Sequence, residues 1–169
     1  MDIRPEGTKD YGAIQHIHDH AFGSAEESAL VHTLRQHPLF LPELSLVASV
    51  EGKLVGHILL FPVIIKNKHQ KHPALALAPM AVLPAHQNEG IGSALTQHAT
   101  EAARAVGYTA IVVLGYPQYY PRFGFKPAAS FNIFPPAREW SSAFFVLELT
   151  GGALADVSGV VQYPPEFGI

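Results

Sequence analysis

The chain has 169 residues and a formal charge of −3 with neutral histidines, and 48% of its residues are hydrophobic. This length suits one domain with a sizeable core, and the hydrophobic fraction argues against intrinsic disorder. Because there is no cysteine, a disulfide framework, a cysteine nucleophile and a thiolate metal site are all excluded. No basic run indicates nucleic-acid binding, and no signal core or membrane-length apolar run occurs. We therefore expect a cytoplasmic protein with neither a nucleic-acid nor a membrane partner.

The first quarter of the chain predicts a short strand and two helices. Residues 2–4 are typical of a strand, and apolar residues spaced by three or four predict a helix over Tyr11 to Phe22. Ser24 with Glu27 three residues later is a capping box, which predicts the start of a second helix. Pro38 should stop that helix.

The next part of the chain predicts antiparallel strands joined by tight turns. Residues 44–50 and 53–65 have strand character and flank Glu51-Gly52, a plausible two-residue hairpin turn. The polar residues 67–71 predict another turn, and 72–82 predict the following strand.

Residues 78–95 contain an apolar strand end, a polar loop with Gly90 and Gly92, and the start of a helix. The first amides of a helix have no partner inside it, and they lie at the positive end of its dipole. We therefore expect this loop to hold a phosphate or pyrophosphate through its backbone. Neither common nucleotide-binding motif fits. A Walker A loop needs Lys and then Ser or Thr after its last glycine, but Ser93 and Ala94 follow Gly92. A dinucleotide fingerprint needs a third Gly or Ala where Leu95 stands.

A βαβ unit is predicted around this loop. The helix should end at Gly107, and residues 108–114 predict a buried strand parallel to 72–82. Pro79 cannot donate to a strand ladder, so the sheet should part there and leave backbone groups to pair with an extended ligand. The predicted buried face of the helix is Ile91, Leu95, His98, Ala102 and Val106.

The last third of the chain predicts a helical turn, a loop and a final strand. The turn is expected near residues 117–123, with Gly124 reversing the chain after it. Residues 131–140 have the composition of a proline-bearing loop. Residues 144–149 predict the final strand, and 159–163 predict a short edge piece.

Two motifs carry a resemblance to a known family. Val82-x-Pro84-x-x-Gln87-x-x-Gly90-Ile91-Gly92-x-x-Leu95 resembles the acetyl-CoA loop of the GNAT superfamily of N-acetyltransferases. About 30 residues downstream, Tyr120-x-x-x-Gly124-Phe125 resembles the second motif of that superfamily. Further short matches resemble its small bacterial YhbS-type branch: Leu46-Val47-Ala48, Val55-Gly56-His57, Leu77-Ala78-Pro79 and Arg122-Phe123-Gly124-Phe125.

The resemblance implies an α/β acyl-CoA N-acyltransferase (GNAT) fold, with a mixed, mostly antiparallel sheet that is splayed near Pro79 and flanked by helices. It implies an N-acetyltransferase domain over residues 1–150, with 151–169 as a C-terminal extension packed on the same domain. The acetyl group of acetyl-CoA, the co-substrate, would pass to a primary amine by direct attack. The acceptor would be a small-molecule or protein amine, and relatives are often homodimers.

The resemblance also assigns roles to residues. Pantetheine would pair with the splayed strand at Met80, Ala81 and Val82, and Tyr120 would be the general acid that protonates the CoA thiolate. The pyrophosphate would lie on the amides of Gln87, Asn88, Glu89, Gly90, Ile91, Gly92 and Ser93.

Several positions leave alternatives open. Gly115 stands where many family members carry a polar side chain, so it makes no side-chain contact with CoA. Glu43, His57 and Glu148 are candidates for the base by residue type and expected location. His16 and His20 would share a face of the first helix, with His18 pointing elsewhere, and this pair favours a solvated face over a zinc site, so no metal is expected. The rival functions are a non-catalytic, CoA-binding regulatory module and the transfer of a longer acyl group.

Overall fold

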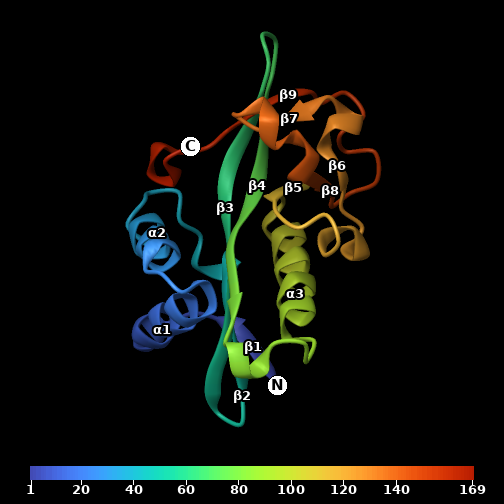
Figure 1. Cartoon of the computed structure of the whole chain (residues 1–169). Helices are drawn as coiled ribbons and strands as arrows, with labels where there is room; N and C mark the ends of the chain where they lie inside the picture. The colour runs from blue at the N-terminus through green and yellow to red at the C-terminus, as the bar shows by residue number, and fades with distance from the viewer. The chain divides into compact units, whose positions relative to one another are not determined.

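A computed structural model describes all residues, 1–169 (Figure 1). Its contacts divide the chain into two compact units. The first comprises Met1–Phe61 and Ala78–Ala102, and the second comprises Pro62–Leu77 and Ala103–Ile169. Two long strands and one helix pass from one unit to the other. The predicted N-terminal domain ends at residue 150, which is not a boundary between these units, and that domain limit stays a prediction.

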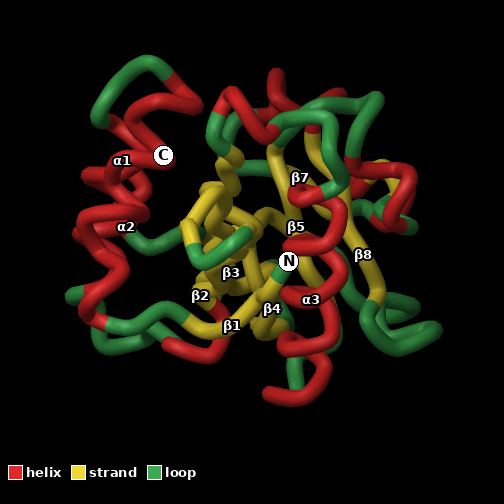
Figure 2. The backbone as a smooth tube through the Cα atoms, turned by 90° about the horizontal axis from the view of Figure 1, so that it is seen from below, coloured by secondary structure: helices red, strands yellow, loops and turns green.

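The first unit is built on antiparallel strands, as predicted. Strand β1 pairs with β2, and β2 pairs with the first half of β3. Helices α1 and α2 lie on one side of these strands, and the N-terminal part of α3 lies on the other (Figures 1 and 2). The bounds are β1 Asp2–Pro5, α1 Tyr11–Phe22, α2 Glu26–Arg35, β2 Ser45–Val50, β3 Lys53–Lys66, β4 Lys71–Val82 and α3 Ile91–Val106.

Local sequence signals account for most of these boundaries. Glu51 and Gly52 have φ angles of 51° and 79°, so the predicted two-residue hairpin turn is confirmed. Helix α1 ends at Gly23, which is left-handed with φ 70°. Helix α2 corrects the capping prediction, because its N-cap is Ala25 and Ser24 instead accepts a bond from the backbone N–H of Glu26 (3.4 Å).

The buried face of α3 also differs from the prediction. Its buried hydrophobic residues are Ile91, Leu95, Ala99 and Ala103, while Val106 is 39% exposed. His98, which was predicted on the buried face, is exposed. The buried residues follow steps of four, and the two alanines let the helix pack closely, so small residues mattered more here than the larger apolar ones.

The second unit contains the parallel pair that the sequence predicted. Strand β4 runs parallel to β5, and β5 pairs antiparallel with β8, which also pairs with β6. The predicted loop over 131–140 is only partly irregular, because β7 within it pairs with β9, which in turn pairs with β3. The bounds are β5 Ala110–Leu114, β6 Lys126–Pro127, β7 Ile133–Phe134, β8 Phe144–Glu148 and β9 Gly159–Gln162.

The ladder between β4 and β5 is short. It joins Leu75 to Ile111 and Ala76 to Val112, and it ends three residues before Pro79. From Ala78 onward, β4 belongs to the first unit, where Leu83 donates to the carbonyl of Val55 (2.8 Å). The predicted end of this pairing near Pro79 is therefore confirmed, and the sheet is mixed and mostly antiparallel.

No helix combines the length and apolar character needed to cross a membrane.

A buried polar network ties four elements of the first unit, α1, α2, β2 and β3, to Glu6 in the segment after β1. His18 of α1 and His57 of β3 are fully buried, and their rings meet through Nε2 and Nδ1 (2.8 Å). The Nε2 atom of His57 lies 2.8 Å from the hydroxyl of Ser45 and 3.4 Å from Glu6. Arg35 of α2 donates to Glu6 through Nε (2.6 Å). Each element thus depends on partners that lie far away in the sequence.

The chain of donors in this network fixes the histidine tautomers. The hydroxyl of Ser45 donates to the Glu6 carboxylate, so its oxygen accepts from Nε2–H of His57. Nδ1 of His57 must then accept from Nε2–H of His18. Nδ1 of His18 therefore carries no hydrogen and can only accept a hydrogen bond. That atom is buried and has no hydrogen-bond partner. Burial lowers the pKa of both rings, that of His18 to about 3, so both are neutral near neutral pH.

Candidate functional site

The loop between β4 and α3 has the backbone of an anion-binding nest. After a 3-10 turn over Pro84–His86, Asn88 and Gly90 adopt left-handed φ angles of 65° and 83°. Glu89 lies between them without a positive φ. Alternation of this kind turns successive N–H groups toward one point, which makes a concave site for an anion.

The N–H groups at the end of this loop and the start of α3 have no partners in the protein. No hydrogen bond is made by the amides of Asn88, Glu89 and Gly90, and the first helical bond runs from Ala94 to the carbonyl of Gly90 (3.0 Å). The amides of residues 91–93 precede that bond and are therefore free as well. Six consecutive N–H groups are thus available at the positive end of α3. This is the donor arrangement that a pyrophosphate requires.

Side chains hold the loop in place rather than point at a ligand. The amide of Gln87 donates to the carbonyl of Val82 (3.1 Å), which fastens the loop to the end of β4. The hydroxyl of Thr96 donates to the carbonyl of Gly92 (2.8 Å) and lies 3.5 Å from the sulfur of Met80. The backbone N–H of Gln87 is also engaged, with the carbonyl of Pro84 (3.4 Å), so the unpartnered donors of the loop begin at Asn88 rather than at the predicted Gln87.

Gly56 lets the start of α3 approach the strands of the first unit. A Cβ atom at Gly56 would lie 3.0 Å from a methyl group of Leu95 and 3.1 Å from one of Ile91. It would also lie 3.4 Å from the carbonyl of Ala81. This role of Gly56 was not predicted from the sequence, although an isolated glycine inside a strand is a known signal of close approach.

Tyr120 belongs to the second unit, at the start of a 3-10 turn over Tyr120–Phe123. It is 7% exposed, and its ring packs edge-on against Phe125 and Tyr119. Burial, with smaller effects from Tyr119 and Tyr116, raises the pKa of Tyr120 well above its usual value. Its hydroxyl makes no hydrogen bond within the protein. The phenol is therefore protonated at neutral pH and free to donate.

The neighbouring tyrosines differ from Tyr120 in exposure. Tyr116 is 74% exposed, and Tyr119 lies under the guanidinium of Arg122, whose carbon is 4.4 Å from the ring centre. Burial therefore sets Tyr120 apart within this group.

Gly115 has a role that its lack of a side chain explains. A Cβ atom there would overlap the ring of Tyr120, so only glycine leaves room for that ring. We expect Gly115→Ala to displace Tyr120 and to lower turnover about tenfold or more, while CoA affinity changes little. Steady-state kinetics and calorimetric CoA titration would check this. Gly151→Ala is the matched control, because a Cβ there would meet nothing within 4 Å.

The three candidate bases differ in their surroundings. Glu43 is exposed and lies in a 3-10 turn over Pro42–Leu44 rather than in the strand. His57 is fully buried, and both of its ring nitrogens are engaged, so it cannot reach a substrate. Glu148 ends β8 and accepts a bond from the amide of Leu154 (3.0 Å). No group of three or more histidine or carboxylate side chains is arranged to hold a metal ion.

The structure collects the predicted residues Met80 to Ser93 in the first unit and places Tyr120 in the second. The chain matches the model of the acetyltransferase (GNAT) family over residues 11–125. With this match, the mixed sheet and the nest at the start of α3, the chain belongs to the GNAT family of acetyltransferases.

Two relatives from Escherichia coli strain K12 bear the name N-acetyltransferase. The chain is 33% identical to the uncharacterized N-acetyltransferase YhbS over 168 residues, which cover 99% of this chain and 98% of YhbS. It is 38% identical to the uncharacterized N-acetyltransferase YjhQ over 126 residues, covering 75% of this chain and 70% of YjhQ. The family and the YhbS resemblance predicted from the sequence are thus confirmed.

Two solved relatives hold CoA ligands. The structure of YhbS from Escherichia coli in complex with CoA has a TM-score of 0.92 and 31% identity, covering 99% of this chain and 92% of that one. A GNAT family acetyltransferase from Brucella melitensis in complex with acetyl-CoA has a TM-score of 0.79 and 30% identity, covering 98% and 97%.

Proposed function

We propose that this protein transfers the acetyl group of acetyl-CoA to a primary amine. The observation that carries the proposal is the run of six unpartnered N–H groups from Asn88 to Ser93 at the start of α3. They would bind the pyrophosphate, and the backbone of Met80, Ala81 and Val82 would pair with pantetheine. The two relatives with CoA and acetyl-CoA support this assignment, since each covers nearly the whole chain.

In the proposed reaction, the nitrogen lone pair of the amine attacks the thioester carbon. The carbonyl oxygen gains negative charge, which an amide of residues 80–82 would stabilise as a preorganised donor. Collapse of the tetrahedral intermediate breaks the carbon–sulfur bond, and the amine proton is lost to solvent or a base. Tyr120 would donate its phenolic proton to the departing thiolate, which requires that its hydroxyl reach the sulfur of bound CoA.

The acceptor is proposed only as a primary amine, on a small molecule or on a protein. A panel of polyamines, amino acids, aminoglycosides and peptides with free N-termini or lysines, with CoA release as the readout, would test the function. Acetyl transfer to at least one amine is expected. Propionyl- and butyryl-CoA, run in parallel, would test the transfer of longer acyl groups.

A substitution at Gly92 tests the loop directly. Gly92 lies in the first turn of α3, where its N–H group is free, so a bulky side chain should obstruct an approaching pyrophosphate. We expect Gly92→Leu to weaken CoA binding about tenfold or more by calorimetry. The exposed Gln97→Leu on the same helix is the control and should bind normally. Unchanged affinity in Gly92→Leu would contradict the loop assignment.

The rival from another class is a regulatory module that binds CoA without turnover. It would keep the nest but would have no need of a protonated phenol at Tyr120. Tight CoA binding with no acetyl transfer to any amine in the panel would favour this rival. The buried phenol of Tyr120, whose hydroxyl makes no hydrogen bond within the protein, favours the acetyltransferase over this rival.

A further inference from the structure

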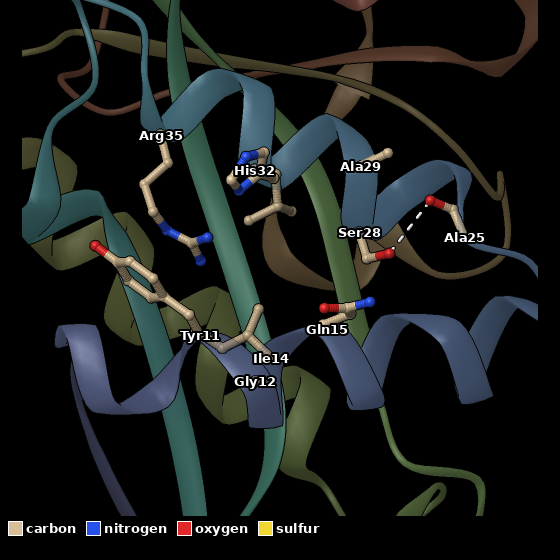
Figure 3. Close-up of a pocket in the computed structure, with 10 residues that line it drawn as sticks. Tyr11, Gly12, Ile14, Gln15, Ala25, Ser28, Ala29, His32 and Arg35 are labelled. Carbon is tan, nitrogen blue, oxygen red and sulfur yellow. Dashed lines mark hydrogen bonds between the residues drawn. The ribbon is translucent and has the colours of Figure 1, made fainter.

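A pocket between α1 and α2 in the first unit plays no part in the acetyl transfer proposed above. Its cavity has a volume of about 320 Å³, at the lower end of the range for small-molecule sites (Figure 3). The pocket is lined by Tyr11, Gly12, Ile14, Gln15, Ala25, Ser28, Ala29, Val31, His32 and Arg35.

The pocket exists because the facing positions of the two helices carry short side chains. A Cβ atom added at Gly12 would meet nothing within 4 Å, and Ala29 adds only a methyl group on the opposite helix. Ile14 and Val31 are each 1% exposed and provide an apolar floor. The cavity therefore offers apolar surface with an open mouth, and its polar groups decide what it can hold.

Arg35 is the polar group that points into the pocket. Its side chain is only 8% exposed, and its guanidinium carbon lies 3.7 Å from the ring centre of Tyr11. Figure 3 shows the guanidinium directed into the space beside Tyr11 and Ile14. The face of Tyr11 and the ion pair with Glu6 hold the guanidinium in one orientation, so it is preorganised.

The Glu6 carboxylate uses only part of the guanidinium. Glu6 accepts from Nε (2.6 Å) and from Nη2 (3.3 Å), and these are the hydrogen bonds of the Arg35 side chain. A guanidinium has five N–H donors, so the edge formed by Nη1 and the second hydrogen of Nη2 is unused. Such an edge matches the two oxygens of a carboxylate.

The remaining lining groups favour an anion over a cation. No aspartate or glutamate lines the pocket, and the other polar side chains are those of Tyr11, Gln15, Ser28 and His32. Ser28 is engaged with Asp19 (2.5 Å), so it is not free to donate. We propose that this pocket binds a small organic carboxylate, with its anion on the Nη1–Nη2 edge of Arg35 and its apolar body against Ile14 and Ala29.

Benzoate is a suitable probe, and benzamide is its uncharged counterpart of nearly the same shape. Titration of the full chain without CoA, followed by two-dimensional ¹H–¹⁵N NMR, should give saturable shifts at Gly12, Ala29 and the Nε–H of Arg35. We expect a dissociation constant on the order of 1 mM for benzoate and about tenfold weaker binding for benzamide. The absence of saturable shifts, or equal binding of benzamide, would overturn the proposal.

Two variants locate the site. Ala29→Leu fills the cavity from an exposed helix position, so benzoate should bind about tenfold more weakly while the melting temperature changes little. Thr33→Leu makes a similar change on the same helix outside the pocket and should bind as the parent does. Arg35→Lys keeps the charge opposite Glu6 but removes the second donor edge, and about fivefold weaker binding is expected.

Parent-like benzoate affinity in Ala29→Leu, or an equal loss in Thr33→Leu, would contradict the assigned position. If Arg35→Lys lowers the melting temperature, Ala29→Leu still decides the location. Because the titration contains neither CoA nor an amine, its outcome is separate from that of the proposed acetyl transfer.

Discussion

Replacing Tyr120 with phenylalanine should lower kcat on the order of 100-fold and leave the affinity for CoA within about twofold of the parent value. The substitution removes only the hydroxyl, so the ring can keep its contacts with Phe125 and Tyr119. The thiolate would then depart without a positioned proton donor. Thiol release in the steady state gives kcat, and calorimetry gives the CoA dissociation constant.

Tyr119→Phe is the matched control for this experiment. Tyr119 is adjacent in sequence and packs edge-on against Tyr120, but it has no proposed part in the reaction. We expect its kcat to stay close to that of the parent. Parent-like turnover in Tyr120→Phe would remove Tyr120 from the mechanism, and a large loss in Tyr119→Phe would instead assign the acid to the neighbouring phenol.

Stability should fall steeply as the pH drops below about 6.5, because His18 and His57 are buried in their neutral forms. Their pKa values are lowered in the folded state, so below pH 6.5 the unfolded chain binds protons that the folded chain does not. With a folded pKa of about 3, His18 alone should cost about 2 kcal/mol of unfolding free energy between pH 7 and pH 5. Urea unfolding across this range would measure the loss.

Charged neighbours shape this acid response. Arg35 further lowers the pKa of both histidines, whereas Glu6 opposes the shift at His57. Despite the cost of burying it, Glu6 has its own pKa lowered to about 2 by bonds from His57, Arg35 and Ser45. Its stabilising contribution is present above its ordinary pKa of 4.5 and disappears toward pH 2, so a second loss of stability follows the first.

His18→Gln separates these contributions. Glutamine can still donate to Nδ1 of His57 but cannot titrate, so about half of the pH dependence between pH 7 and pH 5 should vanish. The exposed His69→Gln is the control and should keep the full dependence. An unfolding free energy that is constant from pH 7 to pH 5 in the parent would show that the two histidines are not held neutral.

Local patterns predicted the elements well where neighbouring residues decide the backbone. The Glu51-Gly52 turn and the left-handed Gly107 and Gly124 follow from the few conformations that such positions allow. Local patterns failed where packing decided instead. Ala99 is buried and His98 is exposed on α3, although the apolar spacing favoured another face.

The sequence by itself determined the family, the position of the nest between β4 and α3, and the motif that contains Tyr120. These are short segments in which spacing and glycine content already define the backbone and the donors it presents. Only the tertiary structure decided that His57 is buried against His18, 39 positions away, and is thereby withdrawn from any role as base. The tertiary structure also showed that Gly115 leaves room for the ring of Tyr120 and that the Nη1–Nη2 edge of Arg35 makes no hydrogen bond to Glu6. The physical reason is that burial and hydrogen-bond partners depend on segments distant in the sequence, whereas turns and helix ends depend on adjacent residues.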